Sequence, residues 1–366
     1  MGNKKKKKSQ KKGKTSSSAP KKEVAKKEEK PAPMTAEEKA AEKAKNRKTT
    51  RNIVLGTVIL ILVLVFISIR YIVQSYYYAF VLRTEDTIEE AMANNDSLSF
   101  SDEEEEELYE LQAEWDSYSN SRLRDTVTVE AEDGAELCGY FFDNDSDVTV
   151  IGLHKYDSSG TDDFLYAEYF SEYNILLPDS RLHGSSGGDA CTFGYLEAYD
   201  LQCWLEWVEE NLGDQTIILV GENMGATTAL IADELGLLEE YDIAFLLADS
   251  PYSSLKELGE YTLWHCYYIP TVLTWVLEAY SNNQDAGFRI SDADALTNAS
   301  EGSIPVLFLI GSENEYVPAD ETEALAEAWG GETEVYSCSS RNGLIYAENT
   351  EEIQSELDHL IETYVE

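Results

Sequence analysis

One long apolar run dominates the hydrophobic pattern, over residues 53–69, and it contains no charged side chain. At about 1.5 Å per residue, a helix of this length spans about 26 Å, close to the roughly 30 Å core of a bilayer. Arg51 and Arg70 flank the run, and the nearby tyrosines at 71 and 76–78 resemble an interfacial aromatic belt. The pattern predicts one transmembrane helix over residues 52–73. A cleaved signal peptide is the alternative, but its charged leader would be far longer than usual.

From about Leu123 onward, short β-rich runs alternate with amphipathic stretches. The later runs, such as IILV, IAFLLA and PVLFLI, are continuously apolar, which is typical of parallel strands buried on both faces. The alternation predicts an α/β fold with a doubly wound, mostly parallel sheet of eight strands and helices on both faces. We expect these strands over residues 126–131, 136–142, 148–153, 174–178, 216–220, 243–248, 305–310 and 333–337.

Helical spacing fills the stretches between these strands. Apolar side chains in residues 195–211 follow the i, i+3, i+4, i+7 pattern of a helix with one buried face, as at Leu201, Trp204, Leu205 and Val208. We expect further helices over residues 224–235 and 321–329. Residues 252–300 are long for one crossover and rich in Tyr, Trp and Leu, so we expect a helical insertion over one end of the sheet.

Charge is divided between the two ends of the chain. Residues 1–51 hold 19 Lys/Arg and 6 Asp/Glu, whereas residues 71–366 hold 8 Lys/Arg and 64 Asp/Glu. Because positive segments stay in the cytoplasm, this asymmetry predicts a single-pass cell-membrane protein with a cytoplasmic N-terminus and an extracytoplasmic main domain. We expect a disordered Lys-rich tail over 1–51, an acidic helical stalk over 74–122 and the α/β domain over 123–366. The tail either attracts anionic lipid or acts only as a topology signal.

Composition also excludes several function classes. The acidic domain lacks the basic face that phosphates require, which argues against a nucleic-acid partner. The five cysteines lie far apart without CxxC spacing, and no HxH, HExxH or Cys/His cluster occurs, so we expect no metal site and no cofactor. The acidic surface either attracts cationic partners or only keeps the protein soluble.

One segment carries a specific structural signal. Residues 216–225 read TIILVGENMG, a buried strand that leads through Gly221-x-x-x-Gly225 into a helix. Such glycines let strand and helix approach closely at a nucleophile elbow. Four other segments share this placement at the ends of predicted strands: IGLHKY at 151–156, LPDSRLHG at 177–184, LIGSENEYVP at 309–318 and NGL at 342–344.

Together, in this order, the five segments resemble the membrane-tethered bacterial α/β-hydrolases of the serine aminopeptidase and dienelactone-hydrolase type, over roughly residues 123–364. The resemblance implies an α/β-hydrolase fold whose oxyanion donors are the main-chain N–H groups of Tyr156 and Met224. At each catalytic position, however, this chain carries an asparagine. Asn223 stands at the serine position, Asn314 at the aspartate position and Asn342 at the histidine position, with Arg341 as the neighbouring candidate for the last.

These substitutions remove the chemistry that the family uses. The reaction needs a hydroxyl or thiol nucleophile, a base, and a carboxylate that orients the base. A carboxamide supplies none of these, so we expect that ordinary ester or amide hydrolysis is lost. The same asparagines fit two explanations: decay of catalysis at a turn where Asn tolerates positive φ, or amides that line a pocket for a neutral polar ligand.

Three functions stay open on the sequence alone. The first is a catalytically inactive pseudohydrolase that binds a small polar ligand or a surface protein partner. The second is an active esterase or peptidase that uses other residues. The candidate nucleophiles are Ser185, Ser186, Ser250, Ser253 and Cys191. Ordinary turn roles explain the serines, and an ordinary core role explains the cysteine. The third is a cell-surface scaffold. An insertion that encloses a pocket over Asn223 favours a ligand, and an open apolar insertion favours a protein partner.

Overall fold

The computed structural model describes residues 33–82, 102–162, 164–265, 278–279, 288–341 and 344–365. By its internal contacts the chain divides into two units, Met1–Leu64 and Val65–Glu366. The second unit contains the whole sheet, and the candidate site is described within it.

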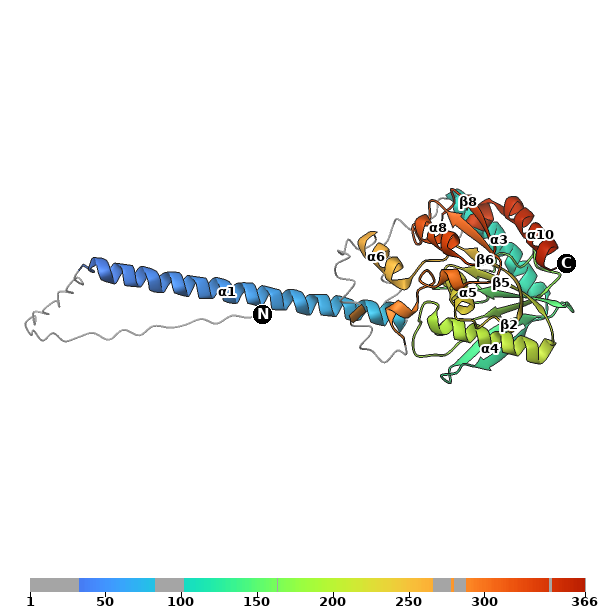
Figure 1. Cartoon of the computed structure of the whole chain (residues 1–366), viewed down its shortest axis with the longest axis horizontal. Helices are drawn as coiled ribbons and strands as arrows, with labels where there is room; N and C mark the ends of the chain where they lie inside the picture. The colour runs from blue at the N-terminus through green and yellow to red at the C-terminus, as the bar shows by residue number, and fades with distance from the viewer. Residues whose placement is uncertain are drawn as a thin grey trace, which may run out of the picture. The chain divides into compact units, whose positions relative to one another are not determined.

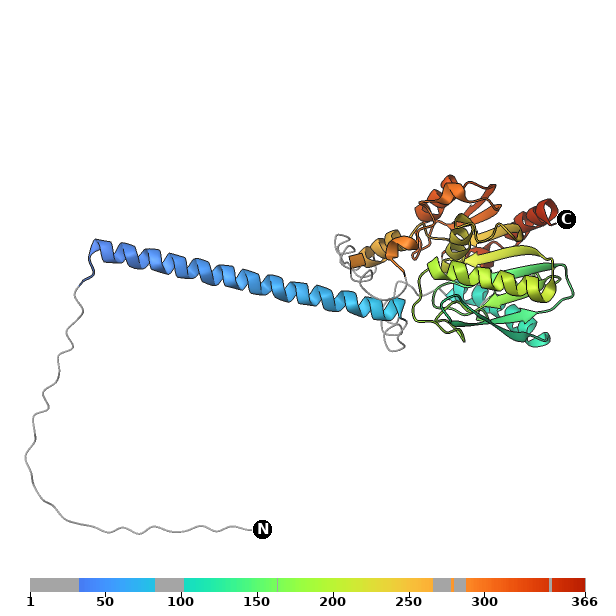
Figure 2. The same ribbon diagram turned by 60° about the horizontal axis from the view of Figure 1, so that its bottom comes forward.

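Helix α1 (Ala36–Tyr76) contains the apolar run and is drawn as one unbroken helix in Figure 2. Among the described residues it is the helix that is long and apolar enough to cross a membrane, and none of its apolar window is buried. A signal sequence shares these properties.

This helix begins inside the tail that we expected to be disordered up to residue 51. Thr35 and Glu38 form a capping box, in which the Glu38 N–H donates to Thr35 Oγ1 at 3.3 Å and the Thr35 N–H donates to Glu38 Oε2 at 2.8 Å. The following Ala, Glu and Lys residues are strong helix formers. The T-x-x-E start signal was present in the sequence, but the surrounding run of charges hid it.

One eight-stranded sheet forms the centre of the domain, with the strand order β1-β2-β4-β3-β5-β6-β7-β8 (Figure 1). The β1–β2 and β2–β4 pairs are antiparallel, and the other neighbouring pairs are parallel. The strands are β1 (Asp125–Glu130), β2 (Glu136–Phe142), β3 (Val148–Leu153), β4 (Asn174–Pro178), β5 (Thr216–Glu222), β6 (Asp242–Asp249), β7 (Val306–Gly311) and β8 (Thr333–Cys338). Each lies within two residues of its predicted bounds, so the apolar runs located the strands correctly.

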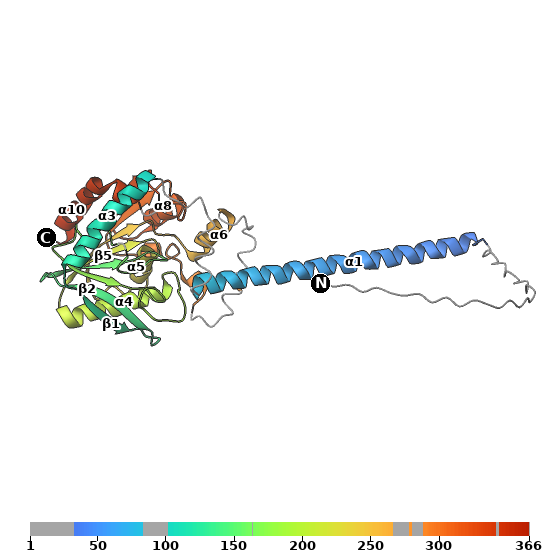
Figure 3. The ribbon, with the colours of Figure 1, turned by 180° about the vertical axis from the view of Figure 1, so that it is seen from behind.

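Helices cover both faces of this sheet, as Figure 1 and the reverse view in Figure 3 show. One face carries α4 (Tyr195–Leu212), α5 (Met224–Glu234) and α8 (Ala319–Ala328). The opposite face carries α3 (Asp102–Ser121), α9 (Ile345–Glu348) and α10 (Thr350–Tyr364). The inner strands are therefore buried on both sides, which explains why their sequences are continuously apolar.

Helix α3 lies within the expected acidic helical stalk over residues 74–122 and packs into the domain, whereas residues 83–101 lie outside the described residues. Its apolar stripe, Leu111, Trp115 and Tyr118, joins the core on the α9 and α10 face. Trp115 is buried, and its Nε1 donates to the carbonyl of Thr161 at 2.9 Å. The acidic run at 102–107 obscured this stripe, and packed structure extends N-terminal to residue 123.

The expected insertion at 252–300 is described in part. It contains α6 (Leu255–His265) and two short 3₁₀ turns, η4 (Ile290–Asp292) and η5 (Ala299–Glu301), whereas residues 266–277 and 280–287 lie outside the described residues. Ala293, Ala295 and Ala299 are fully buried, so the last part of this segment belongs to the core of the domain.

Close main-chain packing at the start of α5 holds this helix against two strands. A Cβ on Gly225 would lie 2.0 Å from the carbonyl oxygen of Leu153, and a Cβ on Gly221 would lie 2.5 Å from main-chain atoms of Ala226. Main-chain neighbours cannot rotate away as a flexible side chain can. Only glycine at these two positions lets α5 begin directly at the ends of β3 and β5.

Replacing Gly225 by alanine should therefore lower the free energy of unfolding by about 3 kcal/mol or more, because the added methyl group must displace main chain. Gly259→Ala in α6 is the matched control: nothing lies within 4 Å of the added Cβ, and helix propensity favours alanine by up to about 1 kcal/mol. Thermal unfolding of the full-length chain in detergent measures both. Equal losses of stability in the two variants would contradict the role given to the close contact.

Candidate functional site

Asn223 occupies the turn between β5 and α5. Its φ is 47° and its ψ is −104°, a backbone conformation that few non-glycine residues adopt. Its N–H donates to the carbonyl of Asp249 at 2.8 Å, and its carbonyl accepts the N–H of Thr227 at 3.0 Å. Two main-chain hydrogen bonds thus hold residue 223 in strained backbone at the carboxyl end of the parallel strands.

Asn314 lies in the loop after β7 and is 6% exposed. Its Oδ1 accepts the N–H groups of Tyr316 and Val317, both at 2.9 Å. The side chain therefore closes a turn in its own loop. An uncharged oxygen is sufficient for this role, so Asn314 shapes the loop without adding a negative charge.

The third asparagine of the expected set, Asn342, lies outside the described residues. Its neighbour Arg341 is described, and Arg341 Nη2 donates to Glu315 Oε2 at 3.2 Å. This ion pair ties the segment after β8 to the loop that holds Asn314.

Two of the four histidines lie near the carboxyl ends of β3 and β4, where each is bonded to main chain. The N–H of Ser180 donates to His154 Nε2 at 2.9 Å, and the N–H of Asp157 donates to His183 Nε2 at 3.4 Å. Each Nδ1 lies within 2.9 Å of a main-chain carbonyl oxygen. A neutral imidazole with its proton on Nδ1 satisfies both contacts, so these rings fix loops. His265 and His359 are exposed on α6 and α10.

Three of the serines considered as alternative nucleophiles, Ser186, Ser250 and Ser253, are also bonded within the fold. Ser250 Oγ donates to Asp249 Oδ1 at 2.8 Å, and Ser253 Oγ donates to Glu321 Oε2 at 2.5 Å. Ser186 Oγ bonds main-chain carbonyl groups. These contacts match the turn and loop roles that serines commonly have.

Tyr156 and Met224, the residues expected to donate to an oxyanion, border an apolar region. Met224 is fully buried, and the Tyr156 ring stacks on Phe193 with 5.1 Å between centroids and an angle of 14°. The buried members of this region, which we call the elbow cluster, are Cys191, Phe193, Met224, Tyr252, Ala293 and Val317. The strained turn is therefore bordered by apolar and aromatic side chains.

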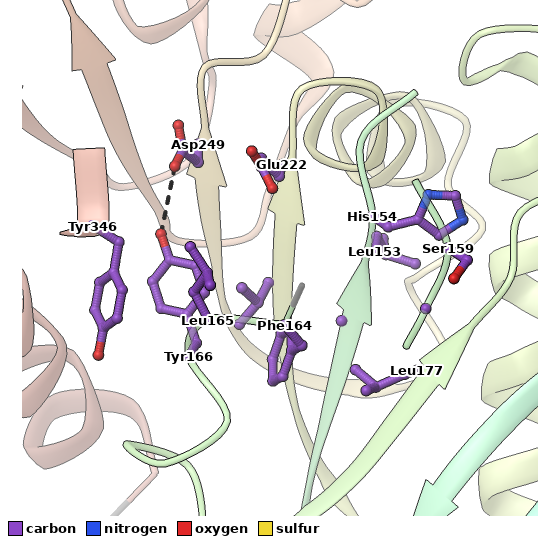
Figure 4. A pocket seen from close by; sticks show the side chains of 13 residues that line it. Leu153, His154, Ser159, Phe164, Leu165, Tyr166, Leu177, Glu222, Asp249 and Tyr346 are labelled. Carbon is purple, nitrogen blue, oxygen red and sulfur yellow. Dashed lines mark hydrogen bonds between the residues drawn. The ribbon is translucent and has the colours of Figure 1, made fainter. Parts of the chain in front are cut away.

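An acidic pair that was absent from the sequence-based predictions, with Asp249 buried and Glu222 partly buried, lies beside the elbow. Glu222 and Asp249 end β5 and β6 and are paired in register, so their side chains lie next to each other on one face of the sheet. Lys155 Nζ lies 3.2 Å from Glu222 Oε1, and the Tyr166 hydroxyl donates to Asp249 Oδ2 at 3.5 Å. Figure 4 shows both carboxylates at the edge of a small cavity of about 30 Å³, room for about one water.

The Asp249 carboxyl of this pair holds its proton more tightly than a free aspartate does. Burial raises the pKa of Asp249 to about 7, and the neighbouring negative charge of Glu222 adds to the rise. The Ser250 hydroxyl and the Lys155 ammonium oppose it. One signal in the sequence was available: each of two apolar strands, IILVGE and IAFLLAD, ends in a carboxylate.

In the described part of the chain, no three His, Cys, Asp or Glu side chains are grouped to hold a metal ion.

Comparison with known proteins supports this reading of the fold. No protein-family model matches the chain. The uncharacterized protein YqkD of Bacillus subtilis (strain 168) is 26% identical over 221 residues, which are 59% of this chain and 72% of YqkD. The esterase Pf2001 of Pyrococcus furiosus superposes with a TM-score of 0.55 and 25% identity, covering 68% of this chain and 95% of the esterase. The α/β hydrolase GrgF of Penicillium sp. sh18 superposes with a TM-score of 0.51 and 17% identity, covering 67% of this chain and all of GrgF.

The chain therefore has an α/β-hydrolase fold, and the predicted fold class is confirmed. Its eight-stranded, mostly parallel sheet carries helices on both faces and is preceded by an apolar helix. The structures that it resembles are esterases and α/β hydrolases.

The acidic pair predicts a defined dependence of stability on pH. Because the pKa of Asp249 rises from its ordinary 3.8 to about 7 on folding, the folded chain binds this proton more tightly than the unfolded chain. The contribution of Asp249 to stability is then fully present below about pH 4, and up to about 4 kcal/mol of it is lost as the pH rises to about 7. Asp249→Asn cannot titrate and should flatten this part of the profile.

Thermal unfolding of the full-length chain across this pH range measures the effect. Asp189→Asn, at an exposed aspartate, is the matched control and should keep the wild-type profile. A profile that Asp249→Asn leaves unchanged would show that the buried carboxyl does not hold the proton.

Proposed function

We propose that the chain is a membrane-anchored pseudohydrolase, an α/β-hydrolase domain that has lost its nucleophile and keeps the elbow as a binding site. The observation that carries the proposal is the residue on the elbow itself. The strained turn between β5 and α5 holds Asn223, with φ 47°, where the hydrolases that the chain resembles hold a nucleophilic serine.

Asparagine preserves the turn and removes the reaction. A carboxamide has no proton that a histidine base removes near neutral pH, so residue 223 cannot form an acyl intermediate. Asn314 supports the proposal, because its oxygen is occupied by two main-chain N–H groups and a neutral amide does not stabilise an imidazolium. His154 and His183 support it as well, because both are bonded to loop main chain rather than placed after β8.

The proposed ligand is uncharged and carries polar groups on an apolar body. Carboxamides both donate and accept hydrogen bonds, so they suit neutral polar groups better than ions. The elbow cluster beside Asn223 supplies an apolar wall, with Met224 adjacent in the chain and Tyr156 packed against it. Apolar walls with a few placed polar groups are the usual composition of small-molecule sites.

We also propose that α1 anchors the chain in the cell membrane by a single pass, with the Lys-rich tail in the cytoplasm and the acidic domain outside. Two features support this arrangement. The apolar window of α1 has the length of a membrane span. The basic residues are concentrated before it and the acidic residues after it.

Restoring the three catalytic side chains tests the proposal. The full-length chain in detergent should not react with a fluorophosphonate probe, because it has no activated hydroxyl. The variant Asn223→Ser/Asn314→Asp/Asn342→His should react about a hundredfold faster or more, since a positioned base contributes 10²–10⁴. The variant Asn223→Ala/Asn314→Asp/Asn342→His is the matched control, which lacks only the new hydroxyl. Turnover of short-chain nitrophenyl esters gives a second readout.

Each outcome decides between the three functions. If the wild type does not react with the probe and the Asn223→Ser/Asn314→Asp/Asn342→His variant does, the result supports a site that is preserved and a reaction that is lost. If neither the wild type nor this variant reacts with the probe, the site no longer accepts a substrate, which favours the scaffold. A labelled wild type, with the label mapped to a particular serine, would replace the proposal with an active esterase or peptidase.

A further inference from the structure

The segment that links α1 to the domain, residues 77–82, packs beside the elbow, and we call it the strap. Helix α1 ends at Tyr76 and continues directly into the π-helical turn η1 (Tyr77–Val81). The N–H of Leu82 donates to the carbonyl of Tyr77, five residues back, at 3.3 Å. Short π-helical turns are rare and frequently occur at functional sites.

The domain satisfies the last carbonyl groups of this helix. The final carbonyls of any helix lack partners within it and carry the negative end of its dipole. Here the Tyr156 hydroxyl donates to the carbonyl of Phe80 at 3.2 Å, and the N–H of Cys191 donates to the carbonyl of Val81 at 2.8 Å. The strap thus presents two adjacent carbonyl oxygens to donors at the edge of the elbow cluster.

The strap side chains pack on the same region. Phe80 and Val81 are half-buried against the elbow cluster, and the Phe80 ring lies 6.3 Å from the Tyr156 ring between centroids. Cys191 Sγ lies 3.7 Å from Met224 Sδ. Met224 directly follows Asn223, so a continuous series of contacts leads from the strap to the elbow turn.

We propose that the strap is a tethered occupant of the candidate site, which a ligand must displace to reach Asn223. This inference rests on the proposed function, because it describes how the same site is closed. The bonded carbonyls of the strap define the chemistry that would replace it: a carbonyl group that accepts from Tyr156 and Cys191, attached to an apolar body that covers the elbow cluster. The ligand class is an uncharged amphiphile with an amide or ester carbonyl.

The strap also places this site close to the membrane. Ile69, the last residue of the apolar run, lies eleven residues before Phe80. Along a helix this separation is about 16 Å, since each residue adds 1.5 Å. With α1 as the anchor, the site opens within that distance of the bilayer surface, where amphiphiles are concentrated.

Native Cys191 reports whether the strap covers the site. It is a buried cysteine whose main-chain N–H is bonded to the strap. Full-length chain in lipid nanodiscs is treated with N-ethylmaleimide, and the labelling rate of each cysteine is followed by peptide mass spectrometry. Phe80→Ala/Val81→Ala should raise the rate at Cys191 about tenfold or more, because local opening becomes easier when apolar packing is lost. Tyr156→Phe, which removes one hydrogen bond, should raise it by about fivefold.

Matched controls come from the same chain. Val65→Ala/Phe66→Ala removes the same two side-chain types from exposed positions of α1 and should leave the rate at Cys191 unchanged. Tyr169→Phe removes a hydroxyl that bonds Asp358 and should also leave it unchanged. Cys138, buried in β2, reports global opening in every sample. The proposal would be overturned if the labelling rate at Cys191 stayed unchanged in both Phe80→Ala/Val81→Ala and Tyr156→Phe. An equal rise in the labelling rate at Cys138 would overturn it as well.

This test is independent of the hydrolase chemistry. A reactive Asn223→Ser/Asn314→Asp/Asn342→His variant together with an unchanged Cys191 rate would reject the strap and keep the pseudohydrolase. A faster Cys191 rate together with a labelled wild-type serine would keep the strap and reject the pseudohydrolase. If the strap and the pseudohydrolase proposals are both correct, adding Phe80→Ala/Val81→Ala to the Asn223→Ser/Asn314→Asp/Asn342→His variant should speed its fluorophosphonate labelling.

Discussion

The candidate site depends on how closely helix α5 approaches the ends of β3 and β5. Gly221 and Gly225 permit this approach, because a side chain at either position would collide with main chain. The same approach forces residue 223 into positive φ. It also brings Tyr156, which follows β3, against the elbow cluster, which contains Met224. An asparagine at 223 keeps all of this geometry, since it tolerates the backbone that the turn imposes. The fold therefore accommodates an asparagine on the turn.

The strand ends separate two environments at this edge of the sheet. Successive residues of a strand point to opposite faces, so the apolar elbow and the acidic pair can lie one residue apart in the chain. The elbow cluster is apolar and packs against Phe80 and Val81 of the strap, whereas Glu222 and Asp249 share a polar niche with Lys155 and Tyr166. The raised pKa of Asp249 thus belongs to a carboxyl whose neighbour in register, Glu222, directly precedes the strained turn.

Local patterns predicted most of the fold. The inner strands were located because burial on both faces requires uninterrupted apolar runs, and α4 and α5 because amphipathic spacing and the two glycines mark them. The misses have local causes as well. A run of carboxylates concealed the stripe that buries Trp115 in α3, and a run of lysines concealed the capping box that starts α1 near Thr35. In both places, charge was read as disorder or solvent exposure although the helix signal was present.

The sequence by itself determined the class of fold and the position of the strained turn between β5 and α5, because each of these is carried by residue types at fixed spacing. It also showed the division of charge on either side of the apolar run. Tertiary structure alone decided which distant residues meet at the site. The Tyr156 hydroxyl bonds a carbonyl 76 residues away in the strap, and Glu222 meets Asp249 only because β5 and β6 pair in register. Such contacts follow from how helices and strands pack, and no local periodicity encodes them.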